Sequence, residues 1–317
     1  MKENKPQIVI AGGNGFLGRT LATHFQQLGY GLTFLTRSPE ETTDGIRKLK
    51  WDGCTLGDWA KELEGADAVI NLVGRSVDCR YNDRNRRLIM ASRVNSTRVI
   101  GEAIAKCKEP PPVWLNASTA TIYKHTFGSG WDESGEIGAT PEAKDDFSIR
   151  VAIAWEQTLN QARTPHTRKV AMRAAMVMGK GGNSVFPVLR RLTRLGLGGQ
   201  MGNGRQFVSW IHEQDFCRAV EWLIKHNEFI GPINICAPNP VTNAEMMRVF
   251  RDVCRMPLGL PAAGWMLEIG AFIARTETEL LIKSRRVVPE KLVKSGFEFR
   301  FPELREAVED LHRKTGG

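Results

Sequence analysis

Three glycines near the start of the chain have the spacing of a phosphate-binding loop. Gly12, Gly15 and Gly18 follow an apolar segment, 7–11, that is expected to form a strand, and they open a segment of helical period over 16–28. Glycines at these places make a tight turn, let the backbone approach a pyrophosphate and let the helix pack closely on the strand. The helix N-terminus attracts the phosphate charge. The pattern predicts a dinucleotide site that includes Gly12, Asn14, Gly15, Phe16, Leu17 and Gly18.

The end of the second expected strand, 31–36, indicates which dinucleotide is bound. An acidic side chain at this place would bind the ribose 2′-hydroxyl of NAD and would repel a 2′-phosphate. The sequence has Thr36, Arg37 and Ser38 instead, and an arginine with two neighbouring hydroxyls suits a 2′-phosphate. We therefore expect NADP in preference to NAD. An arginine exposed in an ordinary turn is the alternative that the sequence leaves open.

Short apolar segments alternate with longer segments of helical period through the first half of the chain. Strands are expected at 7–11, 31–36, 48–51, 68–73, 113–118 and 169–177, and helices at 16–28, 82–107 and 146–162. This alternation is typical of βαβ units around a parallel sheet. We therefore expect an α/β protein with a doubly wound parallel sheet of Rossmann type.

The composition changes after Gly179, where glycine-rich connections surround a helix. From Pro238 onward the pattern is mainly helical, with a core helix expected at 264–274 and a short extended piece near 297–301. We assign these parts to a smaller, mainly helical C-terminal lobe. The expected division is 1–180 plus 206–236 for the dinucleotide-binding lobe, and 181–205 plus 237–317 for the second lobe.

Charge, cysteine spacing and the lengths of apolar runs narrow the class of protein. The net charge of +9 would permit a nucleic-acid partner, but the basic residues are interleaved with acids. A solvated face or a small anionic substrate explains them better, so no nucleic acid is expected. The six cysteines form no CxxC pair and no metal-ligand spacing, which favours reduced thiols, a cytoplasmic location and no metal. We expect neither a secretory signal nor a membrane span.

Four further runs and a C-terminal segment carry recognisable motifs. The runs are 67–74, 93–97, 116–123 and 210–215, and the segment covers 284–292 followed by 296–302. Together with the glycine loop, they resemble the extended short-chain dehydrogenase/reductase superfamily, and the C-terminal segment resembles its atypical, epimerase-like branch. The resemblance implies a homodimer. It also implies further cofactor contacts at Asp52, Leu72, Val73, Gly74, Asn95 and Ser118.

The catalytic residues of that superfamily carry over only in part. In active members a tyrosine acts as acid or base, with its pKa lowered by a lysine four residues later, and a Ser/Thr hydroxyl orients the substrate. Alignment on Glu156 puts Ser148 in the place of the tyrosine and Ala152 in the place of the lysine. The hydroxyl position matches Thr119. Tyr123, just beyond the same strand, is the other catalytic candidate, with a packing role as its alternative.

Four residues are expected to meet the substrate. Arg75 and Arg80 follow the fourth strand and suit an anionic group, although surface exposure explains them equally well, and Gln206 and Trp210 are expected to line the pocket. Nucleotide-sugar enzymes of the superfamily carry a diphosphate-binding arginine where this sequence has Val208. The resemblance therefore supports a small hydroxyl or carbonyl substrate more than a nucleoside diphosphate.

Two functions fit these residues. The first is an NADP-dependent oxidoreductase or epimerase-like enzyme that acts on a small, sugar-derived or anionic substrate without the usual tyrosine–lysine pair. The second is a non-catalytic NADP-binding protein that senses redox state or contacts a partner. The second function explains the retained cofactor site beside the missing pair.

Overall fold

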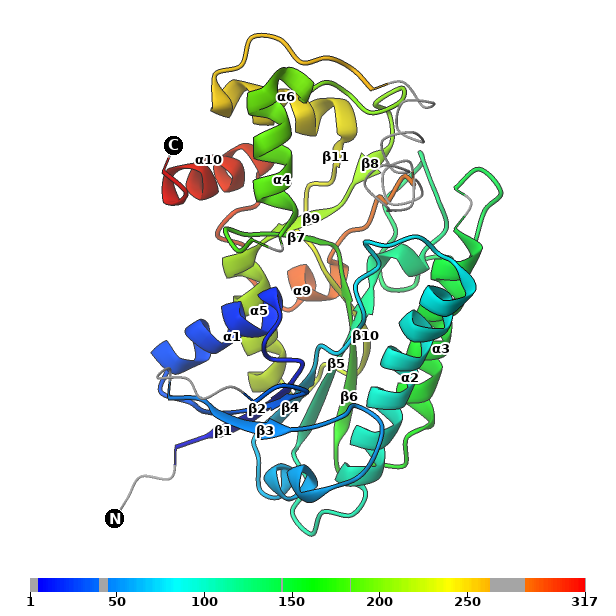
Figure 1. The fold of residues 1–317 in the computed structure, drawn as a ribbon, viewed down its shortest axis with the longest axis vertical. Helices are drawn as coiled ribbons and strands as arrows, with labels where there is room; N and C mark the ends of the chain where they lie inside the picture. Colours follow the sequence, from blue (N-terminus) through cyan, green and yellow to red (C-terminus); the bar gives the residue numbers. More distant parts are fainter. Residues whose placement is uncertain (1–4, 40–44, 144, 183, 263–282, 317) are drawn as a thin grey trace.

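The computed structural model describes residues 5–39, 45–143, 145–182, 184–262 and 283–316. A twisted sheet has helices on both of its faces, and a second, smaller group of helices lies beyond one end of the sheet (Figure 1). The expected α/β fold with a helical C-terminal part is confirmed.

The main sheet has seven strands in the order β10-β6-β5-β4-β1-β2-β3, and every neighbouring pair is parallel. The strands are β1 (Gln7–Ala11), β2 (Gly31–Thr36), β3 (Arg47–Lys50), β4 (Ala68–Asn71), β5 (Val113–Thr119), β6 (Arg168–Ala174) and β10 (Gly231–Ile235). The chain order reverses between β1 and β4. In open α/β sheets, ligands bind at the carboxyl ends of the strands beside such a reversal.

Four helices cover the two faces of this sheet (Figure 1). They are α1 (Phe16–Gln27) and α5 (Glu213–Lys225) on one face, and α2 (Asp83–Ile104) and α3 (Asp146–Gln161) on the other. Because strand side chains alternate, Ile8 and Ile10 pack under α1 and α5, whereas Val9 packs toward α2. Each face of the sheet therefore has its own apolar core. Two short 3-10 helices, η1 (Asp58–Leu63) and η2 (Ala120–Ile122), follow β3 and β5.

The second group of helices has a separate apolar core. Its helices are α4 (Val185–Leu192), the π-helix η3 (Thr193–Leu197), α6 (Asn243–Cys254) and α10 (Leu304–Lys314). Phe186, Met247, Phe250 and Leu311 are buried together there. Two small strand pairs join this group to the main sheet: β7 (Met176–Met178) with β9 (Trp210–His212), and β8 (Phe207–Val208) with β11 (Val241–Thr242).

The C-terminal segment contacts both groups of helices. It contains α9 (Glu290–Lys294), and Leu292 and Phe297 pack into the core beneath the main sheet. Phe301 and the residues of α10 pack into the core of the second group. Because this one segment packs into both cores, the division into two lobes at residues 180, 206 and 237 stays a prediction.

Some expected elements differ from the observed ones. The strand expected at 169–177 is divided, because the amide of Ala175 bonds to Ile235 O and the chain then pairs with β9. The seventh strand, β10, was missed because it begins with Gly231 and Pro232, and proline is tolerated only at a sheet edge such as this one. The piece expected near 297–301 is not in a strand. The helix expected at 264–274 lies outside the described residues.

Candidate functional site

The glycine loop between β1 and α1 is held in a tight turn. Gly12 has φ +79°, a value that favours glycine, and its amide bonds to Leu35 O at 3.0 Å. A Cβ at Gly18 would lie against the backbone of Gly13, so the helix can approach the loop this closely only because residue 18 is glycine. Gly15 caps α1 without a side-chain hydrogen bond, which leaves the amide groups of the first turn for a ligand.

A cavity of about 640 Å³ lies between this loop and the carboxyl ends of β2 and β4. Ten of the residues predicted from the sequence line it: Gly12, Asn14, Gly15, Thr36, Arg37, Asp52, Leu72, Val73, Gly74 and Arg75. These come from separate segments of the first 75 residues, and the fold brings them together around one space.

Polar groups at the β2 side of the cavity are fixed by hydrogen bonds. The side-chain amide of Asn14 donates to Thr36 Oγ1 at 2.8 Å. The side chain of Arg37 is exposed. Asp52 accepts from the amides of Cys54 and Thr55 and from the Thr55 hydroxyl. These hydrogen bonds lower the pKa of Asp52, with the Thr55 side chain as the largest cause. Asp52 therefore shapes the rim of the cavity as a carboxylate.

Trp51 also lines the cavity, and the sequence analysis missed it. Its ring packs on Trp59, and its buried indole N–H has no acceptor among the described residues. The signal that could have found it is its position, directly after β3 and before Asp52.

Several predicted cofactor residues do not line this cavity. Phe16 lines a neighbouring cavity, and Asn95 donates from its amide to Cys54 Sγ at 3.8 Å. The Ser118 hydroxyl donates to Glu156 Oε1 at 2.6 Å and is buried. Leu17 packs against the core beneath α1, and Ser38 contributes its carbonyl to Asn14 at 3.5 Å. Their roles toward a cofactor stay predictions.

Thr119 ends β5 and remains half-buried, with its Oγ1 accepting from the amide of Thr121 at 3.1 Å. Ser148, in the first turn of α3, is half-buried as well. Ala152 is fully buried against Ala120 and Tyr123. The place of the usual lysine is therefore part of an apolar cluster.

Tyr123 does not have the surroundings of a catalytic acid. Its side chain is 1% exposed, and its hydroxyl donates to Asn234 Oδ1 and accepts from Arg173 Nη1, both at 2.8 Å. Burial raises the pKa of Tyr123 to about 12. Arg173 in turn makes a bidentate ion pair with Glu156. Tyr123 therefore belongs to a buried polar network, which favours the packing role, and its catalytic role stays a prediction.

The expected substrate residues divide into two groups. Arg75 is exposed at the cavity, and its Nη2 donates to Asn85 Oδ1 at 3.1 Å; Asn85 also donates to the carbonyl of Arg80. Gln206 is buried and donates to Met201 O. Trp210 is fully buried in the core of the second group of helices. Gln206 and Trp210 are therefore turned into the protein, which corrects their placement in a pocket.

The C-terminal segment lies beside the turn that follows β5. Lys283 Nζ donates to Thr121 O at 2.7 Å and forms a buried ion pair with Asp145. Arg285 Nε donates to Thr121 Oγ1 at 3.1 Å. The sequence analysis missed these contacts, since Lys283 and Asp145 are 138 residues apart and no local pattern connects them.

Among the residues that the structure describes, no helix has both the length and the apolar character needed to cross a membrane. No three His, Cys, Asp or Glu side chains in that part of the chain are grouped as metal ligands would be.

The chain was compared with known proteins. The sequence profile of the NAD dependent epimerase/dehydratase family matches residues 8–236, and that of a domain of unknown function, DUF1731, matches 262–311. The epimerase family protein YfhF of Bacillus subtilis is 31% identical over 97% of this chain and 99% of its own length. The human epimerase family protein SDR39U1 is 28% identical over 96% of this chain and 99% of its own.

Solved structures agree with these matches. A crystal structure of human SDR39U1 with NADPH has a TM-score of 0.84 and 26% identity, and the match covers 97% of this chain and 99% of that one. A UDP-N-acetylglucosamine 4-epimerase from Bacillus cereus, 19% identical with a TM-score of 0.77, shares the fold over 99% of this chain and 100% of that one. The expectation of NADP agrees with the NADPH of the human structure. The chain therefore belongs to the NAD dependent epimerase/dehydratase family.

Proposed function

We propose that this chain binds NADP(H) and acts as an oxidoreductase or epimerase-like enzyme on a small hydroxyl or carbonyl compound. The observation that carries the proposal is the cavity that joins the glycine loop to Arg37. The NADPH in the structure of human SDR39U1, a relative along nearly the whole chain, supports it.

The residues present fit the cofactor. A Cβ at Gly12 would come within 3.2 Å of the backbone of Leu72 and Val73. A larger residue at this position would therefore crowd the end of β4. The open first turn of α1 would hold the pyrophosphate, and Arg37 would hold the 2′-phosphate. When bound, NADP(H) exchanges a hydride with the substrate.

The chain's own side chains orient the substrate and move its proton. The Thr119 hydroxyl would position the substrate oxygen, and Arg75 would attract an anionic group of the substrate. Because the Tyr123 hydroxyl is engaged in the buried network and Ala152 carries no charge, the substrate proton would pass through a group other than the usual tyrosine–lysine pair.

Absorbance of the NADPH band tests this proposal with a panel of sugars, keto acids, aldehydes and UDP-sugars. Substrate-dependent loss of the band, with turnover reduced by Thr119→Val at an unchanged dissociation constant for NADPH, is the expected result. A parallel incubation in D2O, read by NMR, detects an epimerase that restores its cofactor in each cycle. Turnover that is unaffected by Thr119→Val would contradict the role of this hydroxyl.

The second candidate is a non-catalytic NADP-binding protein. The apolar surroundings of Ala152 and the hydrogen-bonded Tyr123 favour it, since neither residue can supply the usual proton transfer. Tight binding of NADPH without turnover or deuterium exchange across the panel is the result that this candidate predicts. A cytoplasmic location and a homodimer remain part of the proposal for both candidates.

A further inference from the structure

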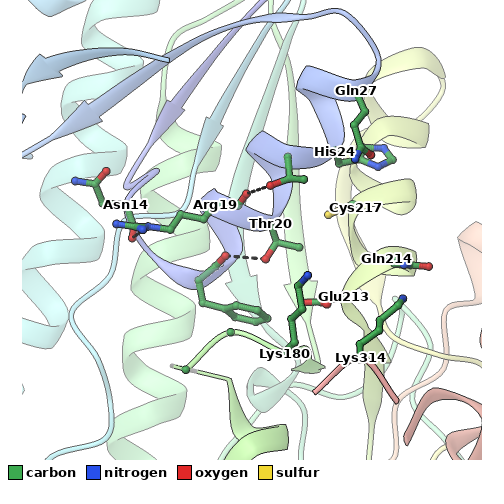
Figure 2. A pocket seen from close by; sticks show the side chains of 14 residues that line it. Asn14, Arg19, Thr20, His24, Gln27, Lys180, Glu213, Gln214, Cys217 and Lys314 are labelled. Atoms are coloured by element: carbon green, nitrogen blue, oxygen red, sulfur yellow. Dashed lines mark hydrogen bonds between the residues drawn. The ribbon is translucent and has the colours of Figure 1, made fainter. Parts of the chain in front are cut away.

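Arg19 is a cation beside the proposed cofactor site. It follows Gly18 directly, lies on the first turns of α1, and its side chain is exposed. Its Nε donates to Asn14 O at 3.0 Å. Figure 2 shows the side chain extended toward Asn14, with its guanidinium beside that residue and away from Lys180 and Glu213. The charged end is therefore held at the glycine loop.

Asn14 connects Arg19 to the turn that carries Arg37. The Asn14 amide donates to Thr36 Oγ1 at 2.8 Å and to Ser38 O at 3.5 Å, on the two sides of Arg37. Asn14 also lines both the cofactor cavity and a neighbouring cavity of about 630 Å³ that Arg19 lines. Asn14 therefore borders both spaces, and its hydrogen bonds hold Arg19 and the turn of Arg37 against the same residue.

The two arginines carry charge that the described residues do not neutralise. Among those residues, no carboxylate forms an ion pair with Arg19 or Arg37, and only Nε of the Arg19 guanidinium has an acceptor. Unpaired guanidinium groups near a helix N-terminus favour a dianionic phosphate, because each offers charge-assisted hydrogen bonds and the helix dipole adds to the attraction.

We propose that Arg19 is a second determinant of NADP(H) specificity, which clamps the 2′-phosphate together with Arg37. This inference rests on the proposed cofactor and assigns one further residue to its recognition. The bond from Nε to Asn14 fixes the guanidinium and leaves both terminal nitrogens for the phosphate. The 2′-phosphate is the group that distinguishes NADPH from NADH, so Arg19 acts on the preference between the two.

Calorimetric titration of NADPH and NADH into the full chain and four variants tests the proposal. The variants are Arg19→Gln, Arg37→Gln, their double, and Arg191→Gln as a matched control on an exposed position of α4. Arg19→Gln should weaken NADPH about tenfold or more, as expected for the loss of hydrogen bonds to a charged group, and change NADH by less than about twofold. The control should change neither constant. The salt dependence of NADPH binding should also be smaller in Arg19→Gln.

A second probe separates phosphate recognition from damage to the loop. Adenosine 2′,5′-bisphosphate should lose affinity for Arg19→Gln, whereas AMP should not. Equal weakening of NADPH and NADH, or no change in either, would overturn the role of Arg19. A wild-type protein that does not prefer NADPH would instead overturn the proposed cofactor. The two failures are therefore distinguishable.

Discussion

Arg173 Nη1 lies 2.8 Å from the hydroxyl oxygen of Tyr123, inside a network that also contains Asn234 and Glu156. This tyrosine stands beyond the end of β5, where a catalytic group would be sought. The arginine holds its hydroxyl within the protein. The network joins β6, β10 and α3, so it stabilises this edge of the sheet.

Tyr123→Phe should therefore affect stability and leave catalysis unchanged. Removing the hydroxyl leaves Asn234 Oδ1 without its donor and Arg173 Nη1 with only the longer bond to Glu133 O, which should lower the free energy of unfolding by about 1–3 kcal/mol. Denaturant unfolding measures this loss, and NADPH titration and turnover serve as controls. A large loss of turnover at unchanged stability would show that Tyr123 takes part in the reaction.

Two alanine substitutions in the glycine loop should have different effects. A Cβ at Gly15 would meet only Gly12 O, at 3.5 Å, so Gly15→Ala should fold normally. Gly15 lines the cavity in which the pyrophosphate is proposed to bind, so NADPH affinity should fall at least about tenfold. Gly18→Ala places its Cβ against the backbone of Gly13 and should lower the melting temperature markedly. Equal melting temperatures of the two variants would contradict this assignment.

His212 should make stability depend on pH. It is fully buried at the start of α5, where its Nδ1 accepts from the amide of Gln214 and its Nε2 bonds to Asp310. Burial lowers its pKa from 6.5 to about 4 in spite of Asp310. Below pH 6.5 the imidazole of His212 is protonated in the unfolded chain but stays neutral in the folded one. The free energy of unfolding therefore decreases as pH falls from 6.5 toward about 4.

The variant His212→Asn isolates this contribution, because asparagine can still cap the helix but does not titrate. A pKa shift of this size changes the free energy of unfolding by roughly 3 kcal/mol between a pH well above 6.5 and a pH well below 4. Denaturant unfolding at about pH 7 and about pH 5 should show a smaller loss of stability in the variant than in the parent. Equal losses in both proteins would mean that His212 does not carry the effect.

The buried ion pair between Lys283 and Asp145 should anchor the C-terminal segment. Their side chains are 1% and 0% exposed, so Lys283→Met would leave an unpaired buried carboxylate. The expected cost is roughly 3–5 kcal/mol in the free energy of unfolding. The double variant Lys283→Met/Asp145→Asn should recover part of this loss, since asparagine can still accept from the amide of Thr140. A double variant no more stable than the single one would contradict the account.

The sequence predicted the parts of the site that depend on local pattern. The glycines after β1 and the basic turn at Arg37 are read from a few adjacent residues, and the fold brings them to one cavity as expected. Trp210 was expected in a pocket but lies in an apolar core. The sequence around an aromatic residue does not distinguish these two positions. The pairing of Lys283 with Asp145 arises only when distant segments meet. Tertiary contacts of this kind leave no periodic signal.

The most direct test of the central claim is a calorimetric titration of NADPH and NADH into the wild-type chain and its Arg37→Asp variant. We predict that the wild-type protein binds NADPH about tenfold or more tightly than NADH, and that the variant loses this preference because a carboxylate repels the 2′-phosphate. An absence of NADPH binding, or the same preference in the variant as in the parent, would contradict the account.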